Sequence, residues 1–151
     1  MDQAWLLGLA IDIIANATDI SYLEMAPQTH SILTPAAKLL RYCYPPKKQV
    51  ILNQELKAIS QFVAIMEATY NRKFVFVNEC TGDHPKFMVQ HGSILMYFAD
   101  FFRNTSLSSD LHTDVCFHLF IDRNDALTLQ LALPITRQII QSIDRPLTEF
   151  A

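Results

Sequence analysis

Three side chains with metal-binding chemistry lie within a short stretch of the 151-residue sequence: Cys80, His84 and His91. Thiolate and imidazole groups are common ligands of zinc, and a structural zinc site uses four of them. A fourth ligand and the paired spacing typical of such sites are missing. We therefore predict ordinary turn and helix-surface roles for these residues, with no metal and no other cofactor.

A nucleophile and a base can also be paired from the sequence. Ser93 or Cys116 could attack a substrate if His91 or His118 removed its proton. Neither nucleophile lies in the strand–turn–helix context that exposes the serine of esterases. The sequence therefore favours a role without catalysis.

Composition limits the classes of partner. Half of the residues are hydrophobic (50%), which is ample for one compact domain or for a small helical segment followed by a small domain. The formal net charge is -3, and the 12 lysine and arginine residues are scattered along the chain. Because nucleic-acid-binding domains carry a basic face, nucleic acid is excluded as the expected partner.

Membrane insertion and secretion are disfavoured as well. Apolar runs near the N-terminus are interrupted by Asp12 and Asp19, well short of the roughly 20 residues that span a bilayer. No basic region precedes the first apolar stretch, as one does in a signal peptide. Cys43, Cys80 and Cys116 form no C-x-x-C pair and leave one cysteine unpaired in any disulfide scheme, which is typical of a reducing compartment. We predict a cytoplasmic protein without a membrane partner.

The elements that position any site begin with two helices. Residues 3–25 carry apolar side chains over much more than one narrow stripe, so this helix needs partners on two sides. A second helix is expected over about residues 28–43. Within it, Pro35 should produce either a kink or a late start.

A small mixed domain should follow these helices. We predict a helix over residues 54–71, a strand over 73–78 and a helix over 85–103. A two-stranded hairpin over 114–121 and 126–133 and a last helix over 134–144 should follow. The stripe of Phe98, Phe101 and Phe102 is interpreted as core rather than as a ligand pocket. This order predicts an α+β fold, with a helical hairpin over residues 1–45 and a two-layer helix and sheet domain over residues 46–151.

Four segments together resemble one kinase family. They are Leu39–Tyr44 (LLRYCY), Val50–Leu56 (VILNQEL), Lys73–Val77 (KFVFV) and Pro85–Asp100. In this order and spacing they resemble the LytS-type sensor histidine kinases, whose pattern contains L-L-R-Y, V-x-L-x-x-E-L, an R-F strand and P-P-x-L-L-Q-P-L-V-E-N-A. The resemblance implies that the N-terminal helical hairpin forms a four-helix bundle in a dimer. It also implies a reduced, vestigial form of the GHKL-type ATPase domain.

The nucleotide-binding residues of this family are missing. Matching Pro85 and Gln90 to the P-P-x-L-L-Q segment places Ile94 and Leu95 where the family has Glu and Asn. The family's Asn binds magnesium and its Glu acts as a general base, whereas aliphatic side chains offer no oxygen ligand. The aspartate-glycine motif that holds adenine is absent too. The resemblance therefore implies a pseudokinase that does not bind ATP.

The phosphoacceptor histidine of the family is missing in the same way. Its P-H-F-L-F-N pattern is followed by I-x-x-L, which matches Ile20–Leu23 and places the histidine on Ile11 or Asp12. No histidine precedes His30. Asp12 is interpreted as a solvated helix residue rather than as a phosphorylated carboxylate.

These observations predict a non-catalytic adaptor in two-component-type signalling. A homodimer should bind a receiver domain or a kinase, because the response regulator of the resembled family docks on the helical bundle. The predicted dimer-interface residues are Leu6, Ile13 and Ile20, and the predicted partner-binding residues, which fit a solvated face equally well, are Asp12, Asn16 and Asp19. Two alternatives stay open: a histidine-kinase-like phosphotransferase of a phosphorelay, and a residual nucleotide-binding enzyme.

Overall fold

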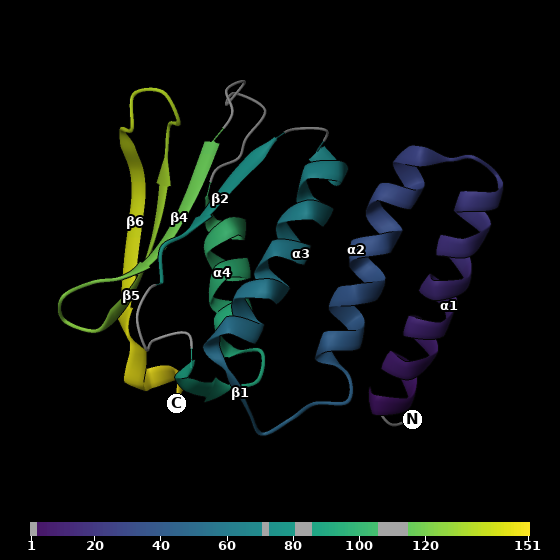
Figure 1. Cartoon of the computed structure of the whole chain (residues 1–151), viewed down its shortest axis with the longest axis horizontal. Helices are drawn as coiled ribbons and strands as arrows, with labels where there is room; N and C mark the ends of the chain where they lie inside the picture. The colour runs from purple at the N-terminus through teal and green to yellow at the C-terminus, as the bar shows by residue number, and fades with distance from the viewer. Residues whose placement is uncertain (1–2, 71–72, 81–85, 106–114) are drawn as a thin grey trace. The chain divides into compact units, whose positions relative to one another are not determined.

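A computed structural model describes residues 3–70, 73–80, 86–105 and 115–151, without the side chains of residues 3–6 and 9 (Figure 1). Its contacts divide the chain into two compact units. The first contains residues 1–47 and 58–72, and the second contains residues 48–57 and 73–151. The predicted α+β class is confirmed.

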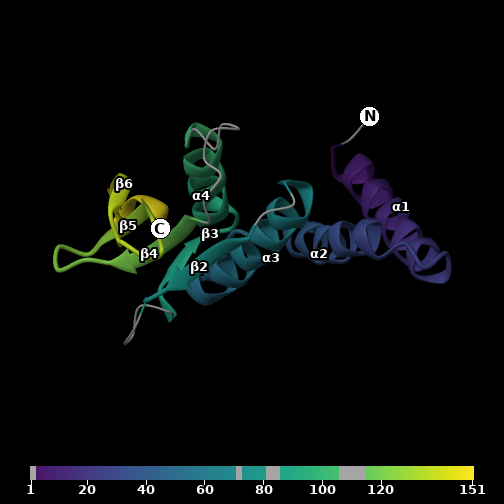
Figure 2. The same cartoon turned by 90° about the horizontal axis from the view of Figure 1, so that it is seen from above.

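The first unit is helical. Helix α1 (Gln3–Leu23) and helix α2 (Pro27–Cys43) lie side by side in both views and are joined by a short turn, in which Met25 has a φ of 55° (Figures 1 and 2). Pro35 lies inside α2, which continues past it after starting at Pro27. Of the two alternatives at Pro35, a kink or a late start, the late start is wrong, because α2 begins at Pro27, which occupies the first turn, where a missing N–H costs no hydrogen bond.

The second unit contains two sheets. Strand β1 (Gln49–Ile51) pairs antiparallel with β3 (Met88–Gln90). A four-stranded sheet has the order β2-β4-β5-β6. Its strands are β2 (Phe74–Asn78), β4 (Val115–Ile121), β5 (Ala126–Ala132) and β6 (Ile139–Pro146). Strands β2 and β4 run parallel, and the other neighbours are antiparallel.

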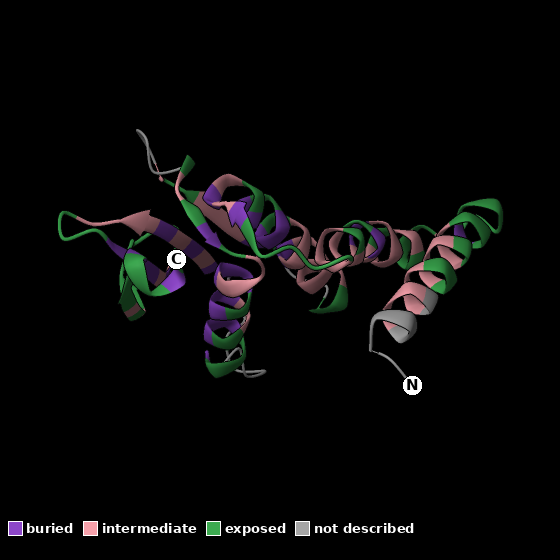
Figure 3. Cartoon of the chain, turned by 90° about the horizontal axis from the view of Figure 1, so that it is seen from below, coloured by how far each residue is buried: buried purple, intermediate pink, exposed green. Residues whose placement is uncertain are grey.

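Helix α4 (Ser93–Asn104) supplies the aromatic core of this unit. Phe98, Phe101 and Phe102 are buried, and each ring contacts Phe117 of β4 at a centroid distance between 5.5 and 6.3 Å. In Figure 3 the buried colour runs along one side of α4. The interpretation of the phenylalanine stripe as core is confirmed. Helix α3 (Leu52–Tyr70) begins in this unit, and a short 3-10 helix, η2 (Leu147–Phe150), ends it.

Two element predictions are wrong. The segment expected to be a helix over residues 134–144 contains strand β6, which pairs with β5 from Ile139 to Pro146. A turn with Arg137 at a φ of 57° precedes it, and ladder pairing overrides the weak local preference. The helix expected from Pro85 starts at Ser93 instead, after strand β3, because Gly92 adopts a φ of 84° that interrupts the chain direction. Pro85 itself lies outside the described residues.

Candidate functional site

Two large apolar side chains are exposed on one side of α1. Ile13 and Ile20 are 57% and 53% exposed, although both are large aliphatic residues on a helix that already packs against α2. They lie seven residues apart and so share one side of the helix. Ile14 and Ser21 each follow one of these residues by one position, about 100° further around the helix, and they are half-buried and buried. Helix α1 is thus apolar on two sides, with a partner from this unit on only one of them in the described residues.

The predicted partner-binding residues lie beside this apolar strip. Asp12, Asn16 and Asp19 are all exposed and recur at helical spacing, so they form one polar stripe along α1. Of the predicted dimer-interface residues, Ile13 and Ile20 lie on the adjacent exposed strip. Leu6 belongs to α1, but its side chain lies outside the described residues.

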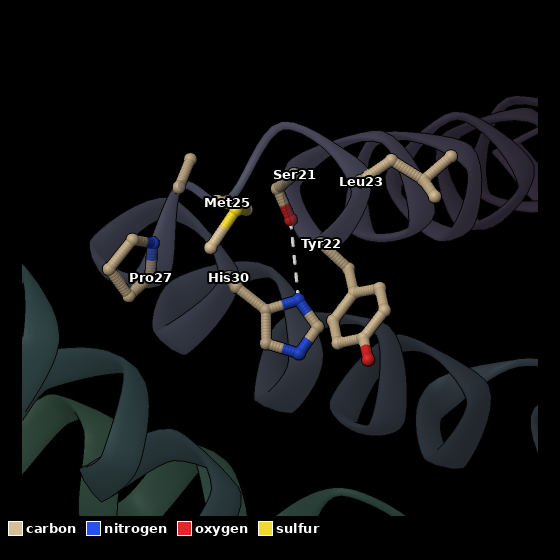
Figure 4. Close-up of a pocket in the computed structure, with 7 residues that line it drawn as sticks. Ser21, Tyr22, Leu23, Met25, Pro27 and His30 are labelled. Atoms are coloured by element: carbon tan, nitrogen blue, oxygen red, sulfur yellow. Dashed lines mark hydrogen bonds between the residues drawn. The ribbon is translucent and has the colours of Figure 1, made fainter.

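A hollow of about 570 Å³ lies where α1 turns into α2 (Figure 4). It is lined by Ser21, Tyr22, Leu23, Met25, Ala26, Pro27 and His30. Tyr22, Leu23 and Met25 are 71%, 78% and 86% exposed, so the apolar walls stand open to solvent. Asp19 precedes Tyr22 and Leu23 by one helical turn, which joins the polar stripe to the rim of the hollow.

A hydrogen-bonded chain fixes His30 at the hollow. The Ser21 hydroxyl donates to the carbonyl of Thr18 at 2.7 Å, so the Ser21 oxygen is left to accept from Nδ1 of His30 at 3.3 Å. In a neutral imidazole with the proton on Nδ1, Nε2 is an acceptor. The Thr34 hydroxyl lies 3.2 Å from Nε2, and in this tautomer it is the donor. The ring also contacts Tyr22 at a centroid distance of 5.8 Å.

Sequence reasoning missed His30 as part of a site. The i and i+4 spacing of His30 and Thr34 on one helix face was available as a signal. The contribution of Ser21 depends on the turn, which brings the end of α1 over the start of α2. Ser21 and His30 are nine residues apart and lie on different helices, so no local sequence pattern marks their contact.

The start of α4 is occupied by a carboxylate of the same unit. Glu55 is fully buried, and its Oε1 accepts hydrogen bonds from the backbone N–H groups of Ile94 at 3.0 Å and Leu95 at 3.2 Å. The N-terminus of a helix attracts anions through its unpaired N–H groups and the helix dipole. Here an internal anion meets that demand. Ile94 and Leu95 are themselves buried, so their side chains face the core rather than a ligand.

The cysteine and serine side chains considered for chemistry are not activated by their surroundings. Burial raises the pKa of the thiol of Cys80, the zinc candidate, to about 11. Burial, and then the negative charge of Glu79, raise the pKa of Cys116, which keeps both cysteines in the unreactive thiol form. The Ser93 hydroxyl donates to the carbonyl of Gln90 at 2.7 Å rather than to a base.

His118 has an acidic neighbour instead of a nucleophile. Its Nε2 lies 2.9 Å from Oε2 of Glu79, a close contact whose direction does not fit a hydrogen bond. Among the described residues, no three His, Cys, Asp or Glu side chains are placed to hold a metal ion. Of the zinc candidates, His84 lies outside the described residues.

No family model matches the sequence, and no curated protein matches it either. None of the helices in the described segments is both long enough and apolar enough to cross a bilayer. All three cysteines lie in described segments, and none forms a disulfide. The residues and their geometry therefore carry the functional argument.

Proposed function

We propose that this chain is a non-catalytic adaptor of two-component-type signalling, which binds a receiver domain or a kinase through a dimeric helical bundle. The observation that carries the proposal is the two-sided apolar character of α1, with Ile13 and Ile20 exposed beside the polar stripe. Contiguous apolar surface rimmed by polar residues is typical of a protein-binding site, and Ile13 and Ile20 share one side of α1 beside the polar stripe.

Both parts of the surface have a role in this proposal. The strip of Ile13 and Ile20 contacts a second copy, and burying the exposed half of each side chain contributes about 1 kcal/mol. The stripe of Asp12, Asn16 and Asp19 lies beside that strip and stays accessible to the partner. The hairpin-and-ATPase architecture of the resembled kinases is part of the same proposal. It is supported by the parallel β2-β4 pair, the β4-β5 hairpin and the placement of α4 on the sheet.

The absence of catalysis is supported at the start of α4. In the resembled kinases the residues aligned with Ile94 and Leu95 are the general base and the magnesium ligand. In this chain both side chains are buried, and the N–H groups above them bind Glu55. A nucleotide phosphate that approached this helix end would have to compete with a carboxylate that is already in place.

Sedimentation tests the dimer. The wild-type chain is expected to sediment as a dimer at micromolar concentration, and Ile13→Lys as a monomer, because burying an unpaired charge costs several kcal/mol. Met96→Lys is the matched control, since Met96 is a 66% exposed residue of α4 and should tolerate a lysine. A wild-type chain that is monomeric at all concentrations contradicts the dimer. Retention of a receiver-domain protein from the native cell then tests the partner class.

A second candidate function, histidine phosphotransfer, is favoured by His30. With the proton on Nδ1, where the Ser21 oxygen accepts it, Nε2 carries the lone pair of the ring, and the Thr34 hydroxyl must turn away before Nε2 can attack. In such a transfer Nε2 attacks the phosphorus of an acyl phosphate, a nitrogen–phosphorus bond forms, and the carboxylate leaves with the electrons of the broken oxygen–phosphorus bond. Incubation with acetyl phosphate should then give an acid-labile phosphoryl group in the wild type and none in His30→Gln. An unmodified wild type excludes this candidate.

A further inference from the structure

The hollow at the α1–α2 turn combines an apolar depression with charge of a single sign. Its walls are largely aliphatic and aromatic, and the side chains that stand farthest into solvent are Leu23 and Met25. The charged residues of α1 and the turn are Asp12, Asp19 and Glu24, all acidic and all exposed among the described side chains. An occupant must therefore offer an apolar group and positive charge.

The aspartates of the polar stripe lie at defined distances from the hollow along α1. Asp19 lies four residues before Leu23, and Asp12 lies seven residues before Asp19. At 1.5 Å per residue the two carboxylates are separated from the rim of the hollow by about 6 and about 17 Å along the helix axis. A second helix with the same repeat can match these separations along its own length.

We infer that this surface binds a helical segment of a partner protein that carries one bulky apolar anchor, together with lysine or arginine residues four and eleven positions from it. The anchor enters the hollow beside Leu23 and Met25, and the basic residues lie opposite Asp19 and Asp12. This inference rests on the proposed adaptor function and names the chemistry of its partner. It leaves the strip of Ile13 and Ile20 to the second copy.

The charge pattern decides against a second copy at this stripe. Two α1 helices placed stripe to stripe would bring aspartates against aspartates, which is unfavourable in either direction. A basic helix removes this repulsion and gains attraction at both carboxylates. The apolar anchor supplies most of the affinity, because exposed ion pairs contribute little each.

The probe is a synthetic helical peptide with one phenylalanine anchor and lysines four and eleven residues from it, titrated by fluorescence anisotropy against the full chain. It should bind, and exchange of the anchor for serine or of both lysines for glutamate should abolish or strongly weaken binding. In the protein, Asp12→Asn with Asp19→Asn should weaken binding about fivefold, as expected for two exposed pairs. The double change Asp100→Asn with Asp144→Asn is the control, since both residues are exposed, belong to the second unit, and change the net charge equally.

Substitutions in the hollow test the apolar part of the inference separately. Leu23→Ser with Met25→Ser should weaken binding at least as much as the aspartate changes, whereas Met96→Ser should leave it unaltered. Equal binding of the lysine and glutamate peptides, or equal weakening by the control pair, overturns the inference. If the aspartate changes abolish self-association instead and the peptide does not bind, a second copy occupies the stripe and the inference is wrong. A chain that dimerises and retains a receiver domain but ignores the peptide keeps the proposed function and refutes only this inference.

Discussion

Removal of the Glu55 carboxylate should strongly destabilise the second unit. The side chain is fully buried, and Oε1 accepts from the N–H groups of Ile94 and Leu95. Glu55→Ala leaves both amides without this acceptor in a site that water does not reach. An orphaned buried donor costs about 1–3 kcal/mol, so two cost about 2–6 kcal/mol. Small domains are stable by only about 5–15 kcal/mol, so the loss is a large share of the total.

A graded series separates the hydrogen bonds from the charge. Glu55→Gln keeps an oxygen in the same place and loses the negative charge that the helix dipole favours, so it should cost about 1–2 kcal/mol. Glu24→Ala is the control, because Glu24 is exposed and should change stability by less than about 0.5 kcal/mol. The order of stability should therefore be wild type and Glu24→Ala, then Glu55→Gln, then Glu55→Ala.

Urea unfolding measures these differences, and amide exchange locates them. The N–H groups of Ile94 and Leu95 should exchange faster in Glu55→Ala than in the wild type, since the lost hydrogen bonds lower the free energy of the local opening from which exchange occurs. If Glu55→Ala unfolds within about 0.5 kcal/mol of the wild type, the carboxylate does not hold the start of α4 and this reasoning is refuted.

The remaining predictions concern nucleotide, pH and surface. Calorimetric titration with Mg-ATP should show no binding at millimolar concentration, which corresponds to a binding free energy weaker than about -4 kcal/mol. A micromolar dissociation constant would contradict the pseudokinase interpretation. Burial raises the pKa of Tyr97 to about 12, because the folded state favours the neutral phenol. The free energy of unfolding should therefore fall as the pH rises from about 10 to 12. Tyr97→Phe should lose this part of the pH dependence in urea unfolding. Asp12→Ala with Asn16→Ala should change the free energy of unfolding by less than about 0.5 kcal/mol and leave the melting temperature nearly unchanged, while weakening partner capture.

The parts of the fold that were predictable from sequence are those with a strong local signal. The strand pair β4-β5 follows from alternation and from the polar turn between Ile121 and Ala126, where the Asp122 side chain accepts from two backbone N–H groups. The phenylalanines of α4 follow from helical spacing. Strand β6 did not follow, because its apolar residues fit a helix as well as a strand and only pairing with β5 decides between them.

The candidate sites were predictable to different degrees for a similar reason. The exposed side of α1 follows from periodicity alone, since one helix sets the spacing of all its members. The hollow depends on the turn, in which Met25 adopts a left-handed conformation that brings His30 to Ser21. Glu55 was visible within the V-x-L-x-x-E-L pattern, yet its role depends on a partner 39 residues away in the sequence. Long-range hydrogen bonds of this kind leave no period to detect.

The two kinds of acidic residue in this chain differ in what they can offer a partner. Glu55 is buried and already bonded to backbone amides, so its charge is used within the fold. Asp12 and Asp19 are exposed and keep their hydration, and transferring them into a dry interface would cost several kcal/mol each. They should therefore act at the rim, where charge speeds the encounter, while the anchor in the hollow sets the lifetime of the complex. Stopped-flow binding should find a slower association for Asp12→Asn with Asp19→Asn and a faster dissociation for Leu23→Ser with Met25→Ser. If the aspartate variant instead dissociated faster and the hollow variant associated more slowly, the aspartates would be buried on binding.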